Sequence, residues 1–402
     1  MNFETFDFHP SIMAGIRALG YSVPTPVQSQ AIPLIMQGRD VIGLAQTGTG
    51  KTAAFVLPIL ERLRSGPQGC VRALIISPTR ELAEQTCEVI SNLGDRTGLQ
   101  SIAVYGGVSI EQQFRGLRNG AEIVTACPGR LLDHLWKGTI SLSDLEILVI
   151  DEADRMFDMG FLPDVRNILR CILHKHQTLL FSATMPADIR RLAREILHDP
   201  VTVQVDPQLP AKTVSHVLYP VQQHLKTNLL KEILNRTEME SVLVFTRTKH
   251  RAERVAQQLA TDGYRVTSLQ GDLTQNRRQT ALDSFRNGSI KILVATDIAA
   301  RGIDVLRISH VINYDMPENT DAYIHRIGRT GRVEKNGNAI TFVTNADVDK
   351  IIALERLLDA PLKRLTLQDF DYSRTAPDKQ SSLSGQPRRY PTQSKRWAKY
   401  SR

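Results

Sequence analysis

Short apolar runs alternate along this chain with longer segments whose apolar positions recur at helical spacing. The runs lie at 40–44, 73–77, 122–125, 145–150, 177–181 and 201–205, and then at 241–245, 291–295, 310–313 and 339–343. Runs that are apolar at nearly every position are typical of parallel strands with helices on both faces of the sheet. The pattern predicts an α/β fold with parallel sheets.

The alternation breaks at a polar stretch with two prolines that runs from Asp206 to Lys212. A chain of 402 residues is also too long for one ordinary hydrophobic core. We therefore expect two tandem α/β domains, 1–206 and 214–372, joined by a short linker. Residues 373–402 are rich in serine, proline and glutamine and short of aliphatic residues, which is typical of a disordered tail.

The composition excludes membrane and disulfide-rich classes of protein. The chain has 42% hydrophobic residues, and no run approaches the roughly 18–20 apolar residues of a membrane helix. Its first residues lack the charged and then apolar order of a signal peptide. The widely spaced Cys70, Cys87, Cys127 and Cys171 are typical of small buried hydrophobes in a reducing compartment. We expect a cytoplasmic protein that does not act at a membrane.

The net charge of +8 is concentrated in the tail. Segment 373–402 carries eight basic residues against Asp378 alone, and Tyr390, Trp397 and Tyr400 lie among them. Basic side chains attract phosphates and aromatic rings stack on unpaired bases, so this composition favours an RNA tether. The alternative is a tail that only improves solubility and whose aromatic residues are incidental.

A phosphate-binding loop follows the first apolar run. It reads Ala-Gln-Thr-Gly-Thr-Gly-Lys-Thr from Ala45, with alanine where the general motif has its first glycine. Gly48 and Gly50 let backbone N–H groups approach phosphates, and the next helix presents its N-terminus to them. Lys51 offers a positive charge to the β- and γ-phosphates, and Thr52 offers a hydroxyl to Mg²⁺. The loop predicts binding of a nucleoside triphosphate.

Two carboxylates follow the apolar run 145–150. Asp151 ends a predicted strand, where open α/β sheets collect ligands, and we expect it to bind Mg²⁺ partly through water. Glu152 is then the carboxylate best placed to orient and deprotonate an attacking water. An acidic helix start explains one carboxylate, but not this pair in a chain that also has a phosphate loop. We therefore expect a triphosphate hydrolase.

With Asp-Glu-Ala-Asp at 151–154, residues 3–370 resemble the DEAD-box family of RNA helicases. The family's adenine-reading segment is similar to 3–28, and its glutamine matches Gln28. A glutamine amide can donate to N7 and accept from the N6 amino group of adenine, which discriminates against guanine. The resemblance implies two RecA-like domains and an ATP site with Mg²⁺ at Thr52 and Asp151. That site comprises Phe3, Tyr21, Gln28, Thr47, Gly48, Thr49, Gly50, Lys51, Thr52, Asp151 and Asp304.

Further segments resemble the family's RNA-facing and coupling motifs. In the first half Cys127 replaces the threonine that usually precedes Pro-Gly-Arg, and in the second half Gln270 stands where most relatives have histidine. We also expect Ser182 and Thr184 to cap the helix that follows them. The resemblance implies RNA contacts from Pro78, Arg80, Gly106, Gly107, Arg130, Gln275, Arg278, Thr296 and Arg301. It implies coupling of hydrolysis to strand separation through Asp154, Ser182, Thr184 and His325.

The segment His-Arg-Ile-Gly-Arg-Thr-Gly-Arg from His325 repeats arginine at every third position, with glycines in between. A solvated basic face of a helix would not need those glycines. Arg329 and Arg332 match the family's arginine fingers, which reach the γ-phosphate from the second half and accelerate hydrolysis by roughly 10³–10⁵. Since Lys51 and Glu152 lie in the first half, hydrolysis would then require the two halves to close.

The implied function is an ATP-dependent RNA helicase that clamps RNA without sequence preference, opens short duplexes and remodels RNA–protein complexes. A DNA-directed helicase and an RNA clamp without productive turnover are the alternatives, although the intact catalytic residues argue against the clamp. Segments 106–110 and 154–161 most resemble the family's bacterial RhlE-like branch. Ribosomal and RNA-decay complexes are candidate partners.

Overall fold

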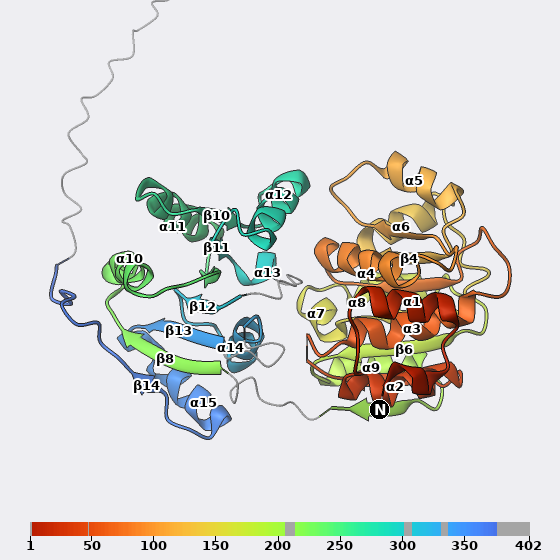
Figure 1. Ribbon diagram of the computed structural model, residues 1–402, viewed down its shortest axis with the longest axis horizontal. Coiled ribbons are helices and arrows are strands. Elements are labelled where there is room, and N and C mark those ends of the chain that lie inside the picture. Colours follow the sequence, from red (N-terminus) through yellow and green to blue (C-terminus); the bar gives the residue numbers. More distant parts are fainter. Residues whose placement is uncertain (1, 47, 206–213, 301–307, 331–336, 376–402) are drawn as a thin grey trace, which may run out of the picture.

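A computed structural model describes residues 2–46, 48–205, 214–300, 308–330 and 337–375 of the chain. The chain forms two lobes that lie side by side, each built on one seven-stranded sheet (Figure 1). The strand orders are β3-β4-β2-β5-β6-β1-β7 and β10-β11-β9-β12-β13-β8-β14. The pairings described within both sheets are parallel, which confirms the predicted α/β class.

The first lobe begins with the short 3₁₀ helix η1 (Phe3–Phe6). Its strands are β1 (Val41–Leu44), β2 (Ala73–Ile76), β3 (Ser101–Val104), β4 (Ile123–Ala126), β5 (Ile147–Ile150), β6 (Gln177–Ser182) and β7 (Val201–Gln204). Its helices are α1 (Pro10–Ala18), α2 (Pro26–Met36), α3 (Lys51–Leu63), α4 (Arg80–Leu93), α5 (Ile110–Arg118), α6 (Pro128–Trp136), α7 (Ala153–Asp158), α8 (Leu162–Leu169) and α9 (Ala187–Ile196).

The second lobe repeats the strand and helix alternation. Its strands are β8 (Val214–Pro220), β9 (Val242–Phe245), β10 (Val266–Leu269), β11 (Ile292–Ala295), β12 (His310–Asn313), β13 (Gly337–Val343) and β14 (Lys363–Arg364). Its helices are η3 (Gln223–Leu225), α10 (Lys226–Arg236), α11 (Lys249–Thr261), α12 (Gln275–Arg286), α13 (Asp297–Ala300), α14 (Thr320–Ile327), η4 (Asn345–Asp347) and α15 (Val348–Leu358).

The ten apolar runs of the sequence all become strands. The sequence pattern missed β3, β8, β10 and β14, of which β3, β10 and β14 lie at sheet edges. Most residues of β3 and β10 are only half-buried, because an edge strand has one neighbour and one open side. A strand that is not covered on every side does not need the continuous apolar run that marks a central strand.

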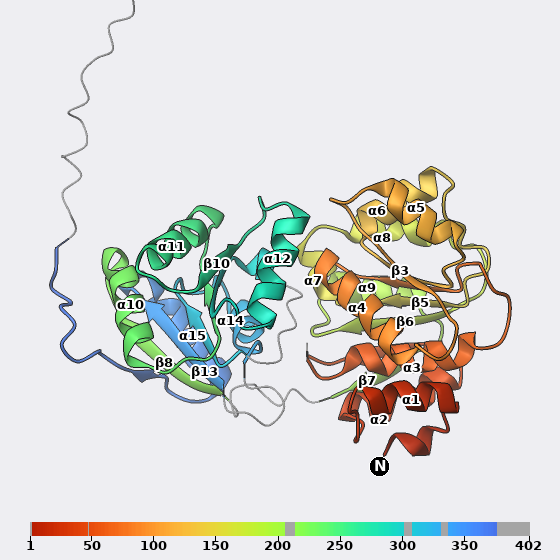
Figure 2. The same cartoon turned by 45° about the horizontal axis from the view of Figure 1, so that its top comes forward.

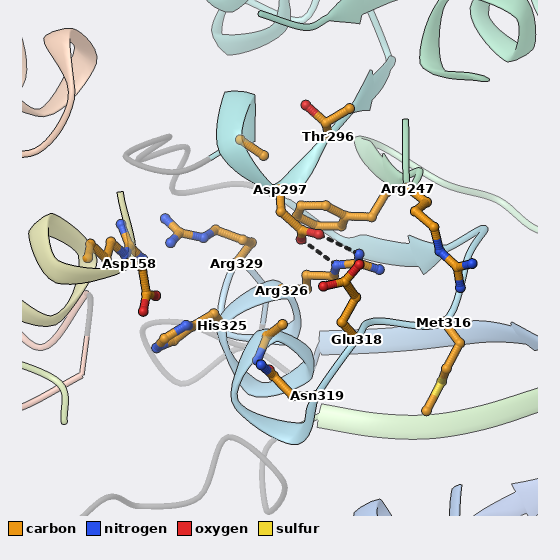
Figure 3. Close-up of a pocket in the computed structure, with 14 residues that line it drawn as sticks. Asp158, Arg247, Thr296, Asp297, Met316, Glu318, Asn319, His325, Arg326 and Arg329 are labelled. Carbon is orange, nitrogen blue, oxygen red and sulfur yellow. Dashed lines mark hydrogen bonds and ion pairs between the residues drawn. The ribbon is translucent and has the colours of Figure 1, made fainter. Parts of the chain in front are cut away.

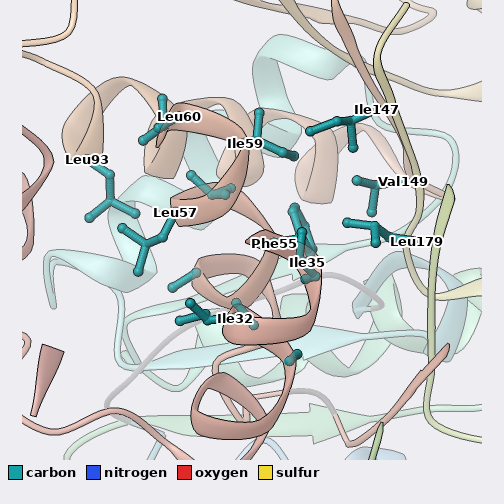
Figure 4. Close-up of a cluster of buried hydrophobic side chains, with 14 of the residues drawn as sticks. Ile32, Ile35, Phe55, Leu57, Ile59, Leu60, Leu93, Ile147, Val149 and Leu179 are labelled. Atoms are coloured by element: carbon teal, nitrogen blue, oxygen red, sulfur yellow. The ribbon is translucent and has the colours of Figure 1, made fainter. Parts of the chain in front are cut away.

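The sheet of the first lobe separates two hydrophobic clusters. Along β2, Ala73 and Ile75 join the cluster on one face, whereas Leu74 and Ile76 join the cluster on the other. Helix α3 lies inside the first cluster, where Phe55 and its neighbours pack between α2 and the sheet residues Ile147, Val149 and Leu179 (Figure 4). Full burial of one such side chain contributes about 1.5–3 kcal/mol. This packing holds the helix that begins at the phosphate loop.

The four cysteines are free thiols, but the prediction that they are buried is wrong. Cys171 is exposed and the other three are half-buried. Cys171 follows α8 in a surface turn, where its thiol donates to the Asn167 carbonyl 3.4 Å away. None of the helices in the described part of the chain has both the length and the apolar character that crossing a membrane requires.

Candidate active site and nucleic-acid interface

A cavity of about 380 Å³ lies where the two lobes meet, beside the phosphate loop and the end of β5. The second lobe contributes Arg329 to its wall, and the first lobe contributes most of the residues that the sequence predicted for ATP. Those first-lobe residues are Phe3, Tyr21, Gln28, Gly48, Gly50, Lys51, Thr52, Asp151 and Glu152. The fold therefore brings into one cavity side chains that are up to 326 positions apart in the chain.

The phosphate loop connects β1 to α3. Gly50 is the N-cap of α3 with φ of 91°, in the left-handed region where a side chain is strained. A Cβ at Gly50 would also lie 2.5 Å from Nε2 of Gln28, so only glycine fits here. Lys51 is buried and its Nζ donates to the Ala45 carbonyl at 2.8 Å, which holds the ammonium over the loop. Thr49 does not line the cavity; its hydroxyl donates to the Gln46 carbonyl.

The adenine-reading segment packs directly on the phosphate loop. Gln28 accepts from the backbone N–H of Thr25 at 2.9 Å and donates to the Gly50 carbonyl at 3.0 Å. Each end of its amide keeps one further hydrogen-bonding position for a base. The rings of Phe3 and Tyr21 stack with centroids 6.3 Å apart, which supports Tyr21 at the mouth of the cavity.

Asp151 and Glu152 of the acidic motif differ in environment. Burial raises the pKa of Asp151 to about 7, and the positive charge of Lys51 opposes this shift. Glu152 has φ of 52°, which is unusual for a residue with a side chain, and it occupies the N-cap position of α7 without a side-chain capping bond. Its Oε2 accepts from Nη1 of Arg155 at 2.5 Å, and both side chains are buried. Arg155 thus orients the carboxylate that was predicted to be the base.

Ser182 and Thr184 contact Asp154 of the acidic motif. Asp154 accepts from the backbone N–H of Thr184 at 2.9 Å and from its hydroxyl at 3.1 Å. Ser182 accepts from the Asp154 N–H and donates to the Thr184 carbonyl. The prediction that Ser182 and Thr184 also cap the next helix is wrong, because the N-cap of α9 is Pro186 and no side chain caps it. The hydroxyls are already engaged by Asp154.

The arginines of the 325–332 segment have different environments. Arg326 is buried, makes a bidentate ion pair with Asp297 at 2.6 and 2.7 Å, and lies over the Phe245 ring (Figure 3). Arg329 lies just after α14 and extends toward α7 of the first lobe, which carries Asp158 (Figure 3). Burial lowers the pKa of His325, and the positive charge of Arg155 adds to this shift.

The RNA residues predicted from the two halves meet across the cleft. Helix α12 lies on the side of the second lobe that faces α4 (Figures 1 and 2). Arg80 Nη1 donates to Gln275 Oε1 at 3.3 Å, and Arg278 Nε donates to Glu81 Oε1 at 2.8 Å. Arg80 also lies against Gly107, where a Cβ would come within 2.2 Å of its guanidinium.

The remaining predicted residues are placed as follows. Pro78 is buried in the turn before α4, and Arg130 lies in the first turn of α6, where it donates to the Val108 carbonyl at 3.1 Å. Thr296 lines a second cavity between the lobes, of about 330 Å³, together with Arg247 and residues of α14. Four predicted residues, Thr47, Arg301, Asp304 and Arg332, lie outside the described residues.

The comparisons with known proteins agree with this geometry. Residues 25–192 match the DEAD/DEAH box helicase family, and residues 225–334 match the helicase conserved C-terminal domain. The chain is 40% identical over 366 residues to the DEAD-box ATP-dependent RNA helicase CshA of Bacillus subtilis, an alignment that covers 91% of this chain and 74% of that protein. The chain belongs to the DEAD-box family of ATP-dependent RNA helicases.

Another DEAD-box relative, RhpA of Helicobacter pylori, is 40% identical over 363 residues, which cover 90% of this chain and 73% of RhpA. Among solved structures, Saccharomyces cerevisiae Dbp5 bound to RNA and ADP BeF3 matches with a TM-score of 0.81 and 30% identity, covering 90% of this chain and 95% of Dbp5. The two lobes are therefore tandem RecA-like domains. The names of these bacterial relatives place the chain in the DEAD-box family but not specifically in its RhlE-like branch.

Sequence reasoning missed one wall of the nucleotide cavity of this DEAD-box protein. Leu82, Gln85, Thr86 and Val89 of α4 also line it. Their spacing puts them on one helix face. The two polar residues on this otherwise apolar face were the feature of the sequence that could have indicated a ligand-binding wall. The Nε2 of Gln85 and the hydroxyl of Thr86 are buried and have no hydrogen-bond partner among the described residues. Arg155, the partner of Glu152, was also missed.

Proposed function

We propose that this DEAD-box protein hydrolyses ATP in the cavity between its lobes and uses the closed state to grip and open short RNA duplexes. The observation that carries the proposal is that Arg329 of the second lobe lies in the wall of a cavity built by Lys51, Asp151 and Glu152 of the first. Catalytic groups divided between two lobes act together only when the lobes are closed.

The residues present fit ATP and magnesium. Thr52 and Asp151 offer the hydroxyl and carboxylate oxygens that Mg²⁺ prefers, and Asp151 is buried beside Lys51. When bound, the ion supplies positive charge to the phosphate oxygens. Glu152, held by Arg155, is the proposed base for the attacking water, and Lys51 is the proposed partner of the β- and γ-phosphates. Arg329, with Arg332 as the second proposed finger, stabilises the charge that develops during hydrolysis.

RNA is the proposed ligand of the surface where α4 and α12 meet. Arg80 and Arg278 lie there, Gly107 lies against Arg80, and Arg130 binds the Val108 carbonyl beside the glycine pair 106–107. Such groups contact phosphates rather than bases. We therefore propose sequence-independent binding, with preference for RNA through its 2′-hydroxyl groups. Dbp5, which shares the fold, has a structure bound to RNA and ADP BeF3.

Several sequence predictions stay proposals. The proposed domains 1–206 and 214–372 are supported by the pairing of strands within each lobe, and the proposed tail 373–402 rests on its composition alone. The roles of Thr47, Asp304, Arg301 and Arg332 follow from the family motif alone. Cytoplasmic location, ribosomal or RNA-decay partners, tail-mediated RNA binding and placement in the RhlE-like branch also remain proposals.

The test is phosphate release by the full chain as a function of added single-stranded RNA or single-stranded DNA, with Lys51→Ala as the background control. We expect RNA to raise the rate and DNA to leave it near the basal level. Equal stimulation by DNA would favour the DNA-directed helicase. Binding of RNA and an ATP analogue without phosphate release would favour the clamp without turnover.

A further inference from the structure

Helix α5 has an unusual packing residue. In this nine-residue helix the residue that is fully buried is Gln113, whose exposed fraction is 5%. A helix normally buries aliphatic side chains, and a buried amide destabilises the fold unless each of its polar atoms is hydrogen-bonded. The surroundings of Gln113 therefore explain why a glutamine occupies this position.

Both ends of the Gln113 amide are used. Nε2 donates to the Tyr105 carbonyl at 2.8 Å. Oε1 accepts from Nη1 of Arg130 at 3.2 Å and lies 3.3 Å from Nε2 of His134. Because a carbonyl can only accept and an arginine can only donate, these partners determine which end of the amide is oxygen.

The same network includes His134, which is buried on α6 one turn after Arg130. Its Nδ1 lies 2.7 Å from the Thr139 hydroxyl. Since the Gln113 oxygen can only accept, Nε2 carries the proton and donates to it; Nδ1 of the neutral ring then accepts from the Thr139 hydroxyl, in place of that hydroxyl's 3.1 Å contact with the His134 carbonyl. Burial lowers the pKa of His134, which keeps the ring neutral in this arrangement.

This network holds one short loop. Tyr105 and Val108, whose carbonyls accept from Gln113 and Arg130, bracket the glycine pair 106–107. Gly107 in turn lies against the guanidinium of Arg80, at a φ of 89°. The loop has no side chains of its own at its two glycines, so its position depends on the groups that bind its flanking carbonyls.

We propose that Gln113, with His134 as its partner, is a positioning residue that sets the glycine loop and Arg130 in place for RNA. The proposal rests on the RNA-dependent function proposed above. Gln113 is buried, so its proposed role does not depend on contact with nucleic acid. Gln113 joins α5, the glycine loop 106–107 and α6. It thereby fixes the position of the loop relative to Arg130 before RNA binds.

The test compares Gln113→Leu with Gln112→Leu, because Gln112 is the exposed neighbour on the same helix. Four quantities are measured for the full chain: the RNA concentration that half-saturates ATP hydrolysis, the rate at saturating RNA, the affinity for a fluorescent ADP analogue, and the thermal midpoint. We expect Gln113→Leu to raise the half-saturating RNA concentration about ten-fold, since several net hydrogen bonds are lost. In Gln113→Leu the ADP affinity and the rate at saturating RNA should change less than two-fold. In Gln112→Leu the half-saturating RNA concentration, that rate and the ADP affinity should all change less than two-fold, and the thermal midpoint should stay close to that of the wild type.

If Gln113 had a purely structural role, Gln113→Leu would lower the thermal midpoint, but the half-saturating RNA concentration measured well below that temperature would be unchanged. That result would overturn the proposal. His134 gives a second test. His134→Gln keeps an N–H donor near Nε2, so it should retain more RNA affinity than His134→Leu. Equal RNA affinities for these two variants would contradict the assigned partner.

If Gln113→Leu does not fold, Gln113→Glu is compared with Gln112→Glu. The glutamate accepts from Arg130 and His134 but cannot donate to the Tyr105 carbonyl. We therefore expect Gln113→Glu to raise the RNA concentration that half-saturates ATP hydrolysis. An unchanged concentration would overturn the proposal. Wild-type protein that RNA does not stimulate would instead refute the proposed function itself.

Discussion

Arg278 of the second lobe and Glu81 of the first form an ion pair across the cleft, although 197 positions separate them in sequence. The Nε of Arg278 donates to Oε1 of Glu81 at 2.8 Å, and the side chains are 11% and 4% exposed. Glu81 is adjacent to Arg80, which contacts Gln275 of the same second-lobe helix. The start of α4 is therefore held by α12.

Removal of either member of this pair is expected to disfavour closure, because it leaves the other charge buried and unpaired. We expect Arg278→Met and Glu81→Gln each to reduce RNA-stimulated ATP hydrolysis at subsaturating RNA by about 10–100-fold, or about 1.4–2.7 kcal/mol. The double variant should lose less than the sum of the two. Arg277→Met, which removes the exposed neighbouring arginine on α12, is the control. Additive losses in the double variant would show that the pair is not coupled.

Glu152→Gln is expected to separate nucleotide binding from hydrolysis. Glutamine keeps an oxygen that accepts from Arg155 but cannot take a proton from water. We expect the rate at saturating RNA and ATP to fall about 10²–10⁴-fold while affinity for an ATP analogue changes little. Single-turnover hydrolysis and analogue titration measure the two effects, with the exposed Glu88→Gln as control. Wild-type turnover in Glu152→Gln would remove this residue from the role of base.

The two glycines of the RNA-facing pair should differ in their tolerance of a methyl group. A Cβ at Gly107 would lie 2.2 Å from Nη1 of Arg80 and at a φ of 89°, whereas the nearest atom to a Cβ at Gly106 is 3.5 Å away. We therefore expect Gly107→Ala to raise the RNA concentration that half-saturates ATP hydrolysis about ten-fold. Gly106→Ala should raise this concentration less. RNA titrations of ATP hydrolysis compare the two variants. The reverse order would mean that contact with RNA, rather than with Arg80, controls this site.

Acid should destabilise the second lobe through His310. Burial lowers the pKa of this histidine below its ordinary value of 6.5, and its Nε2 lies 3.3 Å from the Asn338 amide nitrogen. Between the lowered pKa and 6.5 the unfolded chain binds a proton that the folded chain does not, so stability falls as pH falls through this window. We expect His310→Gln to reduce the drop in thermal midpoint between pH 8 and pH 5. The exposed His174→Gln is the control, and equal drops in all three proteins would contradict the assignment.

Deletion of 373–402 should weaken RNA binding and flatten its dependence on salt. The tail carries eight basic residues against one acidic residue, and each phosphate contact releases counterions. The rate of ATP hydrolysis at saturating RNA should be largely retained, since the described catalytic residues precede the tail. RNA affinity measured over a series of salt concentrations gives the slope. An unchanged slope would favour the tail as an aid to solubility.

Local sequence determined much of this protein. Central parallel strands must be apolar on both faces, so the ten runs that became strands were visible without a structure. Gly50 has a conformation that favours glycine, and Asp151 follows a buried strand, so the phosphate loop and the acidic motif were placed by local rules. Such features depend on a residue and its near neighbours in the chain.

Tertiary structure alone decided which distant groups became partners. The local sequence patterns do not predict three of the contacts between distant segments. These are the pair of Glu81 and Arg278, the contacts of Gln113 with Arg130 and His134, and the α4 wall of the nucleotide cavity. The edge strand β3 is half-buried for the same reason, because its position in the sheet, and not its sequence, sets its exposure. A side chain's partner is determined by packing of the whole fold, and that information is not contained in any short stretch of sequence.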